Sequence, residues 1–429
     1  MTLPFSAVVL FVTLLALMFL GMPIAMALIL SSILSIIVDG SYPITVAAQR
    51  MFTGADTFSL LAIPFFMLAG EIMQKGGLSK RLVDFANSLV GWISGGLSLV
   101  SIVACTFFAA ISGSSVATSA AIGGIMYPEM VKHGYPKDYS AAVQAIGGTL
   151  GIVIPPSIVF IMYGTATNVS IADLLMSGVI PGFFTCFALC ALAVLFAKKN
   201  NYPKNNGFDI KEVGKTFKAS IFALLMPLII LGGIYAGIFT PTESAVIAVV
   251  YGFVVSLFIY KEIELKDIGT IIIATAKSTA NLMILVIAAQ LFGWLITMYN
   301  VPNIVTNAVL SVAGNKYIFL IFVNIILLIT GMFMEVGATV LILAPIMHPM
   351  AVAYGINPVH FGMIVVFLLA LGQATPPFGT TLFVSCGISK EPVVNVSKKV
   401  MPFIICEVVC ALVFSFVPIL STWLPGLMK

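Results

Sequence analysis

Long apolar stretches separated by short polar interruptions fill almost the whole chain. An apolar helix of about 20 residues can cross the hydrocarbon core of a membrane, so the 429 residues have room for about a dozen spans. The first stretch starts near Leu3 with no Lys or Arg before it and continues past Pro23 to Val38, too long for a cleavable signal peptide. We therefore expect an all-α polytopic membrane protein that begins with two spans.

The composition supports a membrane environment. Hydrophobic residues make up 60% of the chain and charged residues 8%, whereas soluble domains carry about 25% charged residues. The net charge of +4 is scattered without a basic stripe, so nucleic-acid binding is not expected. The six cysteines lie in apolar runs without zinc-like spacing, so the sequence predicts no transition metal and no cofactor.

An internal repeat relates the two halves of the chain. Positions 111 to 183 align without a gap to the positions 221 residues later in the chain. Upstream of position 111 this offset between matching residues changes to 223 and then to 218. We predict two repeats, 1–205 and 206–429. The matching residues are Thr118 with Thr339, Met126 with Met347, Pro128 with Pro349, Gly134 with Gly355, Gly151 with Gly372, Pro155 and Pro156 with Pro376 and Pro377, Pro181 with Pro402, Gly70 with Gly293 and Pro23 with Pro241.

The charges predict that the two repeats are inverted. Short cytoplasmic loops collect Lys and Arg. Lys75, Lys80 and Arg81 correspond to uncharged residues of the second half, while Lys398 and Lys399 correspond to uncharged residues of the first. Equivalent loops therefore lie on opposite faces, and both termini are expected in the periplasm. Each repeat should contain five spans and one helical hairpin, because an odd number of crossings inverts the next copy.

The predicted path has the same parts in both repeats. Repeat 1–205 contains scaffold spans in 5–74, including one near 44–74, then a hairpin at 88–131 and a broken helix at 140–165. Repeat 206–429 contains scaffold spans in 219–298, a hairpin at 317–353 and a broken helix at 360–386. The first hairpin should open toward the cytoplasm and the second toward the periplasm.

Two matched polar segments interrupt the predicted hairpins. Residues 112–118 read SGSSVAT, and residues 333–339 read FMEVGAT. Non-helical backbone at membrane depth is tolerated only inside protein or beside a water-filled cavity. Two interruptions at equivalent places therefore favour a buried site over two surface turns. Their free carbonyls and hydroxyls are hard oxygen ligands, suited to a cation such as sodium.

A second matched pair of interruptions contains double prolines. Residues 147–157 read GGTLGIVIPPS, and residues 372–379 read GQATPPFG. Proline removes a backbone donor and stops a helix, so each span should consist of two half-helices. The carbonyl ends of half-helices favour cations and the amide ends favour anions. Paired broken spans in inverted halves indicate the binding site of a transporter.

Ionisable side chains have a small part in this prediction. Arg50 and Arg81 are the only arginines, and neither lies at a break. Glu335 at the second tip is a candidate site residue, with capping of the next helix as the alternative. Residues 240–243, TPTE, are typical of a capping box, and Glu407 is expected near a span end, within reach of the interface. A bound carboxylate should therefore contact half-helix amides and the hydroxyls of Ser112, Ser115, Ser157, Thr380 and Thr381.

At these motifs the chain resembles a known family. Residues 112–118, 151–157, 240–245 and 372–377 are together similar to the large membrane subunit of tripartite ATP-independent periplasmic (TRAP) transporters, most of all its sialic-acid branch. The resemblance covers essentially the whole chain. It implies an elevator transporter of the ion-transporter superfamily, in which a domain with the hairpins and broken helices slides against a scaffold. It also implies sodium coupling, a bacterial inner membrane, and two partners: a small four-helix membrane subunit and a periplasmic binding protein.

The resemblance further implies two sodium sites with the substrate between them. The first would use Ser112, Ser114, Ser115, Gly151, Ile154 and Pro155. The second would use Met334, Glu335, Gly337, Gly372, Thr375 and Pro376. The predicted function is sodium-driven symport of a small carboxylate, with sialic acid (N-acetylneuraminate) as first candidate and a C4-dicarboxylate or another organic anion as the alternative.

Three other classes of protein fit the sequence less well. An ion channel would have a continuous polar pore, whereas polar positions here cluster at two tips and two breaks. An intramembrane enzyme would need a nucleophile and base or a metal constellation, such as a membrane-embedded Asp pair, and the sequence contains none. A purely structural protein gives no reason for paired interruptions, because they weaken spans. We therefore predict a transporter and not an enzyme.

Overall fold

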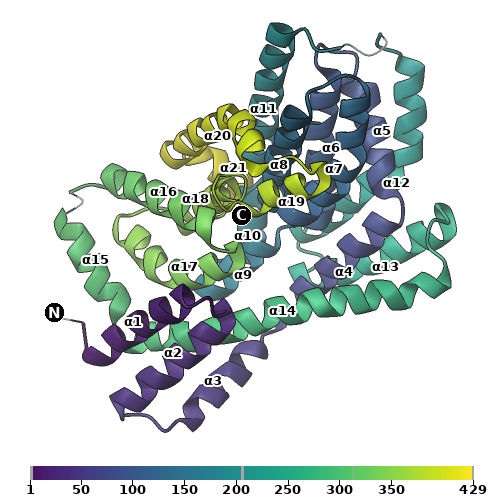
Figure 1. Cartoon of the computed structure of the whole chain (residues 1–429). Helices are drawn as coiled ribbons and strands as arrows, with labels where there is room; N and C mark the ends of the chain where they lie inside the picture. Colours follow the sequence, from purple (N-terminus) through teal and green to yellow (C-terminus); the bar gives the residue numbers. More distant parts are fainter. Residues whose placement is uncertain (1–2, 204–206, 313, 428–429) are drawn as a thin grey trace.

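The computed structural model describes residues 3–203, 207–312 and 314–427, and within these residues the chain is helical without a β-strand (Figure 1). Eight of the described helices are long and apolar enough to cross a membrane, and a bent pair supplies a ninth candidate span. Large apolar side chains such as Phe5, Phe52 and Phe258 are exposed on the outside of these helices. Exposed apolar surface of this extent is typical of contact with lipid. The prediction of an all-α polytopic membrane protein is confirmed.

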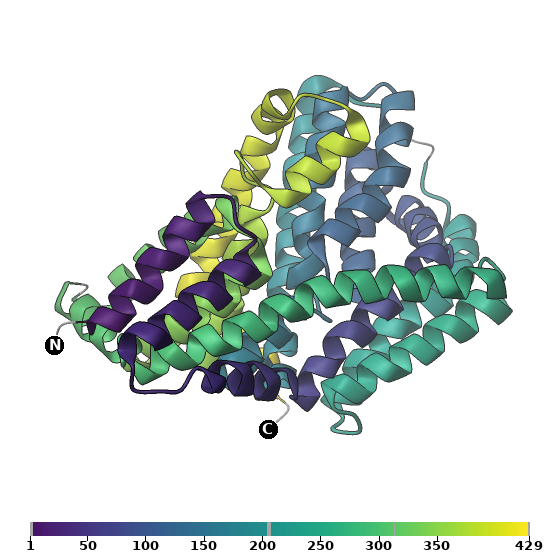
Figure 2. The ribbon, with the colours of Figure 1, turned by 60° about the horizontal axis from the view of Figure 1, so that its bottom comes forward.

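The helices form two layers, a lower row and an upper bundle in Figure 1. We call the lower row the scaffold layer. Its long helix α14 packs against α2, α3 and α4, and Figure 2 shows it running across the molecule. Helices α5 (Leu78–Val90) and α12 (Ile210–Tyr235) pack on each other beside this layer. The scaffold layer contains α1 (Phe5–Phe19), α2 (Ile24–Asp39), α3 (Thr45–Ala55), η1 (Phe58–Leu61), α4 (Ala62–Lys75), α13 (Pro241–Val254), η2 (Val255–Ile259) and α14 (Leu265–Met298).

The upper bundle takes helices from both halves of the chain. The first half supplies α6 (Gly96–Ser112), α7 (Ser115–Lys132), α8 (Lys137–Val153), α9 (Ile158–Thr167), α10 (Ile171–Ser177) and α11 (Val179–Asn200). The second half supplies α16 (Lys316–Phe333), α17 (Val336–Ala353), α18 (Pro358–Gly372), α19 (Thr380–Ser389), α20 (Val393–Phe416) and α21 (Ile419–Gly426), and α15 (Val301–Val312) packs on α17 at its edge. Helices α6 and α7 occupy the stretch predicted as the first hairpin, and α16 and α17 the stretch predicted as the second.

The centre of the bundle is formed by the first parts of the two broken spans. In α8 every residue from Tyr139 to Val153 is buried, and in α18 every residue from His360 to Gly372 is buried. The two helices pack on each other. A helix that is apolar on all sides belongs in the interior. The breaks that follow these helices therefore lie at the end of the most buried segments of the molecule.

The sequence repeat is also a structural repeat. Helix α17 begins and ends 221 positions after α7 (Ser115–Lys132 against Val336–Ala353), and α16, α18 and α19 closely match α6, α8 and α9. The packing is reciprocal, since α9 contacts α17 while α19 contacts α7. In the scaffold layer α2 contacts α14, while its counterpart α13 contacts α4. Such reciprocal contacts are what a two-fold relation between the halves produces.

One predicted span is divided in the structure. Residues 44–74 form α3, η1 and α4, with the interruption at Asp56 and Thr57. Helix α3 lies close against α14, because a Cβ added at Gly54 would stand 2.6 Å from Cβ of Gln290. Within the scaffold layer, the short helix α3 is therefore held against α14 by close contact at Gly54. Arg50 lies on this helix.

Candidate functional site

The first hairpin tip is held by its own hydroxyl groups. Ser114 is the N-cap of α7, and its side chain accepts a hydrogen bond from the Ala117 amide at 3.3 Å. The Thr118 hydroxyl donates to the Ser114 carbonyl at 2.8 Å and lies 2.9 Å from the Ser112 hydroxyl. Gly113 has a φ of +61°, a conformation that costs glycine little. Ser112 and Ser115 are buried and Ser114 partly so.

The first break lies directly against this tip. The Ile158 amide donates to the Gly113 carbonyl at 3.4 Å, and the Ser115 hydroxyl donates to the Thr149 carbonyl at 3.5 Å. A Cβ at Gly151 would stand 2.5 Å from the Ser114 carbonyl oxygen and 2.7 Å from Cα of Ser115, so only glycine fits there. The structure thus brings the tip together with Gly151 and with the segment from Ile154 to Ser157, all of which is buried.

Four helix ends therefore meet at this place. Helices α6 and α8 end there, and α7 and α9 begin there. Ser157 caps α9 by accepting from the Phe160 amide at 3.4 Å. The last carbonyls of a helix carry partial negative charge and the first amides partial positive charge. One small region can thus offer oxygen ligands to a cation and amide groups to an anion.

The second tip repeats the capping pattern with a different residue. Glu335, the counterpart of Ser114, is the N-cap of α17, and its carboxylate accepts from the Ala338 amide at 2.8 Å. The Thr339 hydroxyl donates to the Glu335 carbonyl at 2.9 Å, as Thr118 does to Ser114. Glu335 therefore caps a helix, which was the alternative expectation, and it is exposed while Met334 is partly buried. Gly337 lies beside Met162 of α9.

The second break is more open than the first. The Thr381 hydroxyl donates to the Gln373 carbonyl at 2.9 Å, and the Thr375 hydroxyl donates to the Leu371 carbonyl at 2.8 Å. Pro376 is partly buried and Pro377 is exposed, whereas both prolines of the first break are buried. In the described residues the buried Thr380 hydroxyl and the side-chain oxygen of Gln373 have no hydrogen-bond partner. Polar groups without a hydrogen-bond partner in the described chain are therefore present at this break.

The second tip and the second break touch less closely than the first pair. The rings of Phe333 and Phe378 lie 5.7 Å apart. The close backbone approach is one turn before the tip, where Gly372 lies against Gly331. Within the described chain no hydrogen bond joins Met334, Glu335 or Gly337 to Thr375 or Pro376. The structure gathers the first predicted ion-site residues into one cluster and leaves those of the second set more dispersed.

The predicted substrate residues lie on both sides of the bundle core. Ser112, Ser115 and Ser157 belong to the first cluster. Thr380 and Thr381 begin α19, which packs on α7 and α8, and Tyr127 of α7 donates to the Ser389 carbonyl at the end of α19 at 3.2 Å. Both sets of hydroxyls therefore flank helix α8. Their assignment to substrate stays a prediction.

The structure corrects the expectation for Glu407. This residue does not reach an interface: it is 1% exposed, in the middle of α20. The Thr149 hydroxyl lies 2.7 Å from one of its carboxyl oxygens and 2.6 Å from the Ile146 carbonyl, and the other carboxyl oxygen has no partner among the described residues. A hydroxyl has one proton to donate, so both short contacts are satisfied if Glu407 is protonated. Sequence reasoning placed this residue wrongly because its neighbours show only an apolar helix.

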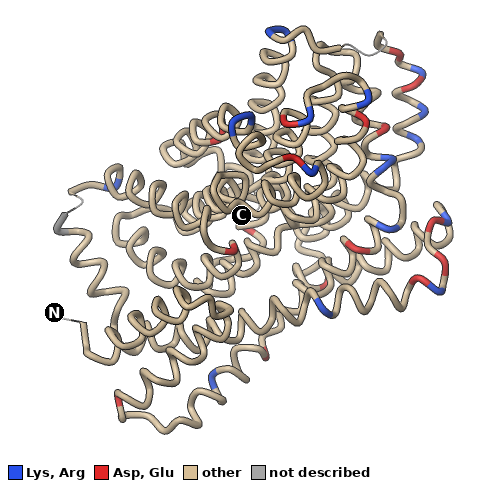
Figure 3. The backbone as a smooth tube through the Cα atoms, viewed as in Figure 1, with Lys and Arg blue, Asp and Glu red and all other residues tan. Residues whose placement is uncertain are grey.

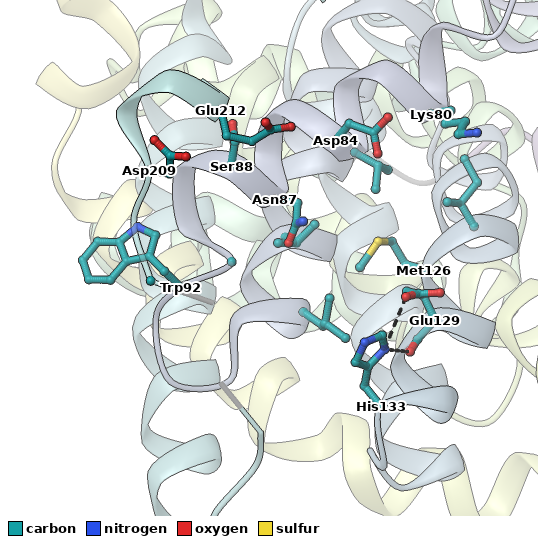
Figure 4. Close-up of a pocket in the computed structure, with 16 residues that line it drawn as sticks. Lys80, Asp84, Asn87, Ser88, Trp92, Met126, Glu129, His133, Asp209 and Glu212 are labelled. Atoms are coloured by element: carbon teal, nitrogen blue, oxygen red, sulfur yellow. Dashed lines mark hydrogen bonds and ion pairs between the residues drawn. The ribbon is translucent and has the colours of Figure 1, made fainter. Parts of the chain in front are cut away.

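A large cavity of about 880 Å³ lies between α5, α6, α7 and the start of α12 (Figure 4). Its charged side chains are mainly acidic, and His133 contacts Glu129 at 3.3 Å. Burial raises the pKa of Asp84, and the nearby Lys80 and Arg81 act against this rise. The ionisable lining residues are Lys80, Asp84, Glu129, His133, Asp209 and Glu212. The excess of carboxylates makes this cavity unfavourable for an anion.

A smaller cavity of about 430 Å³ has the opposite character. It lies between α3 and α14 on one side and α9 and α17 on the other. Arg50 is the charged residue in its lining, which otherwise consists of uncharged polar and apolar residues. The residue pattern does not indicate this arrangement, because α3 reaches the cavity only through its packing on α14. Arg50 is thus a candidate binding residue that sequence reasoning missed.

The comparisons with known proteins agree with this architecture. Residues 11–420 match the family model described as the DctM component of the tripartite ATP-independent periplasmic transporter. The chain is 40% identical over 444 residues to the C4-dicarboxylate TRAP transporter large permease protein DctM of Vibrio cholerae, covering 99% of this chain and 98% of the relative. It is 35% identical over 414 residues to the sialic acid TRAP transporter large permease protein SiaM of the same species, covering 96% and 97%.

A solved structure supports the fold. The YdaH transporter of Alcanivorax borkumensis is similar with a TM-score of 0.61 and 15% identity, over 89% of this chain and 88% of that one. At this identity the likeness concerns the fold alone. The family match and the curated relatives extend over nearly the whole chain, and they confirm the resemblance that the hairpin tips and double prolines indicated. The chain belongs to the tripartite ATP-independent periplasmic transporter family, as its DctM component, the large permease.

Proposed function

We propose that this protein is the sodium-coupled translocating subunit for a small organic acid in a bacterial inner membrane. The observation that carries the proposal is the meeting of four helix ends at the first tip and break, with Gly151 packed on the Ser114 carbonyl. This geometry supports a sodium site built from carbonyl and hydroxyl oxygens of Ser112, Ser114, Ser115, Gly151, Ile154 and Pro155. The second set, with Met334, Glu335, Gly337, Gly372, Thr375 and Pro376, is its repeat-related counterpart.

The first substrate candidate is a C4-dicarboxylate. The DctM relative named for this substrate is 40% identical to the chain, and the SiaM relative named for sialic acid is 35% identical. This order is the reverse of the one that the sequence motifs favoured. Both substrates are carboxylates, so both fit the amide ends of half-helices and the hydroxyls of Ser157, Thr380 and Thr381.

Coupling of sodium and substrate follows from the direct contact between the first hairpin tip and the first break. Sodium bound at the first cluster would hold the Ser112–Ser115 backbone against Gly151, and so would order the α7 and α9 amides that face the anion. The substrate site is complete only when the ion is present. Each sodium ion that moves inward gains about 2.3 kcal/mol per 100 mV of membrane potential, which drives the uptake.

The two layers support an elevator movement. The upper bundle would carry the ion and substrate sites, and the scaffold layer would stay fixed in the membrane. The two layers meet at α14 with α17 and at α4 with α6. At the second of these contacts Gly70 of α4 lies against Ser112, with a Cβ at Gly70 standing 3.5 Å from Cα of Ser112. A glycine at this contact leaves a smooth surface for sliding. The proposed partners are a small four-helix membrane subunit and a periplasmic binding protein, and the proposed orientation has both termini in the periplasm.

The proposal is tested by uptake into proteoliposomes that contain the large subunit with its small membrane subunit. A periplasmic binding protein loaded with labelled succinate or labelled N-acetylneuraminate is added outside, with and without an inward sodium gradient. We expect accumulation of one acid that stops when the sodium gradient is collapsed. Accumulation that persists without sodium would overturn the sodium coupling.

The first ion site is tested by Ser112→Ala and Ser115→Ala. Losing one ligand should raise the sodium concentration for half-maximal uptake about tenfold, since about 1.4 kcal/mol corresponds to a factor of ten. Ser177→Ala is the matched control, because Ser177 is equally buried but donates to the Leu174 carbonyl in α10. Unchanged sodium dependence in both tip variants would remove this site.

A further inference from the structure

The cavity beside Arg50 lies where the scaffold layer and the upper bundle meet. Helices α3 and α14 form its scaffold side, and the end of α9 and the middle of α17 form its bundle side (Figure 1). Its volume of about 430 Å³ is within the range of small-molecule sites. The charge pattern of the sequence assigns this face to the periplasm, because α9 and α14 both lead away from basic loops. The cavity is therefore in position to receive a solute from outside.

Arg50 gives this cavity a positive charge. No carboxylate in the described part of the chain lies within ion-pair distance of it. Its guanidinium lies over the Trp294 ring at 4.9 Å from the centroid, and Trp294 in turn packs edge-on against Tyr42 at 5.3 Å. An aromatic face positions a guanidinium without neutralising it. Arg50 is thus held in place, and within the described residues its guanidinium donates no hydrogen bond, which leaves its donors for a ligand.

The uncharged groups around Arg50 select for a carboxylate. The amides of Asn168 and Gln290 bring two further donors, and Gln290 is fixed where Gly54 packs against it. The hydroxyls of Thr53 and Thr165 already donate to carbonyls of their own helices, at 2.9 and 2.8 Å. An arginine fork binds a planar carboxylate through two parallel hydrogen bonds. The donor set therefore fits one carboxylate group rather than a cation or a neutral sugar.

We propose that Arg50, with Asn168 and Gln290, forms a carboxylate subsite that receives the organic acid from the periplasmic side before it reaches the site between the tips. This inference rests on the proposed function and adds a specific anchor for the acid. The subsite is built from both layers, since Arg50 and Gln290 belong to the scaffold layer and Asn168 to the bundle. A movement of one layer against the other would divide it and release the acid.

The test is ligand protection of a cysteine placed in the cavity. Thr53→Cys is introduced into the large subunit, and the reconstituted complex is treated with N-ethylmaleimide in the absence and presence of succinate or N-acetylneuraminate. Alkylation of Cys at this position is measured by mass spectrometry. We expect the acid that the same vesicles transport to slow alkylation at least threefold. Succinamide, which lacks the carboxylate charge, should give no protection.

The controls separate the subsite from general effects. Ser41→Cys lies on an exposed turn outside the cavity, and its alkylation should not change with either acid. In the Thr53→Cys background, Arg50→Gln should abolish protection, and Arg50→Lys should keep part of it, since lysine retains the charge but not the fork. Lys316→Gln, which removes an exposed charge at the start of α16, should leave protection intact.

The possible failures are distinguishable. If the vesicles transport an acid that does not protect position 53 from alkylation, the subsite is wrong while the proposed function stands. If protection persists in Arg50→Gln, the anchor is wrong. If the wild-type complex transports neither acid, the proposed function is overturned and the subsite with it.

Discussion

Gly151 is the residue on which the first cluster depends most directly. A Cβ at this position would stand 2.5 Å from the Ser114 carbonyl oxygen and 2.7 Å from Cα of Ser115, and both partners are backbone atoms. We expect Gly151→Ala to push the tip away from the break and to reduce sodium-dependent uptake more than tenfold. Gly124→Ala in α7 is the control, because nothing lies within 4 Å of a Cβ there. Wild-type uptake in Gly151→Ala would show that the tip and break need not touch.

Glu407 allows a test of a neutral carboxyl group near the same cluster. If it is protonated and donates to Thr149, an amide can replace it, so we expect Glu407→Gln to retain uptake within about threefold. Glu407→Ala leaves the Thr149 hydroxyl with one partner fewer in a buried site, which costs about 1–3 kcal/mol. The expected sign is a lower melting temperature for the alanine variant in detergent. Loss of uptake in Glu407→Gln with normal melting would instead assign the carboxyl a role in ion coupling.

Asp84 supports a prediction about pH. Its pKa is raised by burial beside the acidic cavity, so the folded protein favours the protonated form more than the unfolded chain does. The preference for the protonated carboxyl contributes to the stability of the folded state at pH values below the ordinary pKa of an aspartate. This contribution to stability is lost as the pH rises through the raised pKa of Asp84. Asp84→Asn should therefore raise the melting temperature slightly at pH 7 and not at pH 4. A lower melting temperature at pH 7 would contradict this sign.

At the scale of elements, helix-breaking residues were the basis of most of the prediction. Double prolines and polar glycine-containing segments mark the ends of α6, α8, α16 and α18, and the structure places breaks at these positions. Helix period was of less use, because helices in lipid can be apolar on every side. For this reason the sequence could not tell that Glu407 faces the core, or that α3 packs on α14 and places Arg50 beside a cavity.

The capping box of α13 is an element boundary that the sequence identified and the structure confirms. The Thr240 hydroxyl accepts from the Glu243 amide at 3.2 Å, and the Glu243 carboxylate accepts from the Thr240 amide at 2.7 Å. Thr240→Ala should destabilise the helix by about 1 kcal/mol, seen as a lower melting temperature with unchanged affinity for sodium. Thr240→Ser is the matched variant and should melt like the wild type. An equal loss in both would point to the methyl group rather than the cap.

At the scale of the whole molecule, the two halves support each other. Helix α9 of the first half packs on α17 of the second, and α19 packs on α7. The second part of each broken span thus packs on a hairpin of the opposite half, while the first break lies against the hairpin tip of its own half. Figure 3 shows most charged residues in the right half of the molecule, where the first turns of α12 carry Lys211, Glu212, Lys215 and Lys218. The predicted inversion would place a two-fold axis in the plane of the membrane, and this would account for the difference in charge between equivalent loops.

Inversion of the repeats predicts opposite sidedness for two equivalent residues. Lys132 and Ala353 are the last residues of α7 and α17, both are exposed, and they are 221 positions apart. In intact cells a membrane-impermeant thiol reagent should label Ala353→Cys, which the predicted topology places on the periplasmic side, and should label Lys132→Cys only after permeabilisation. The six native cysteines are buried or partly buried, so their background should be low. Because the predicted inversion requires the two hairpins to enter from opposite sides, labelling of both positions from one side would overturn the inverted arrangement of the two predicted sites.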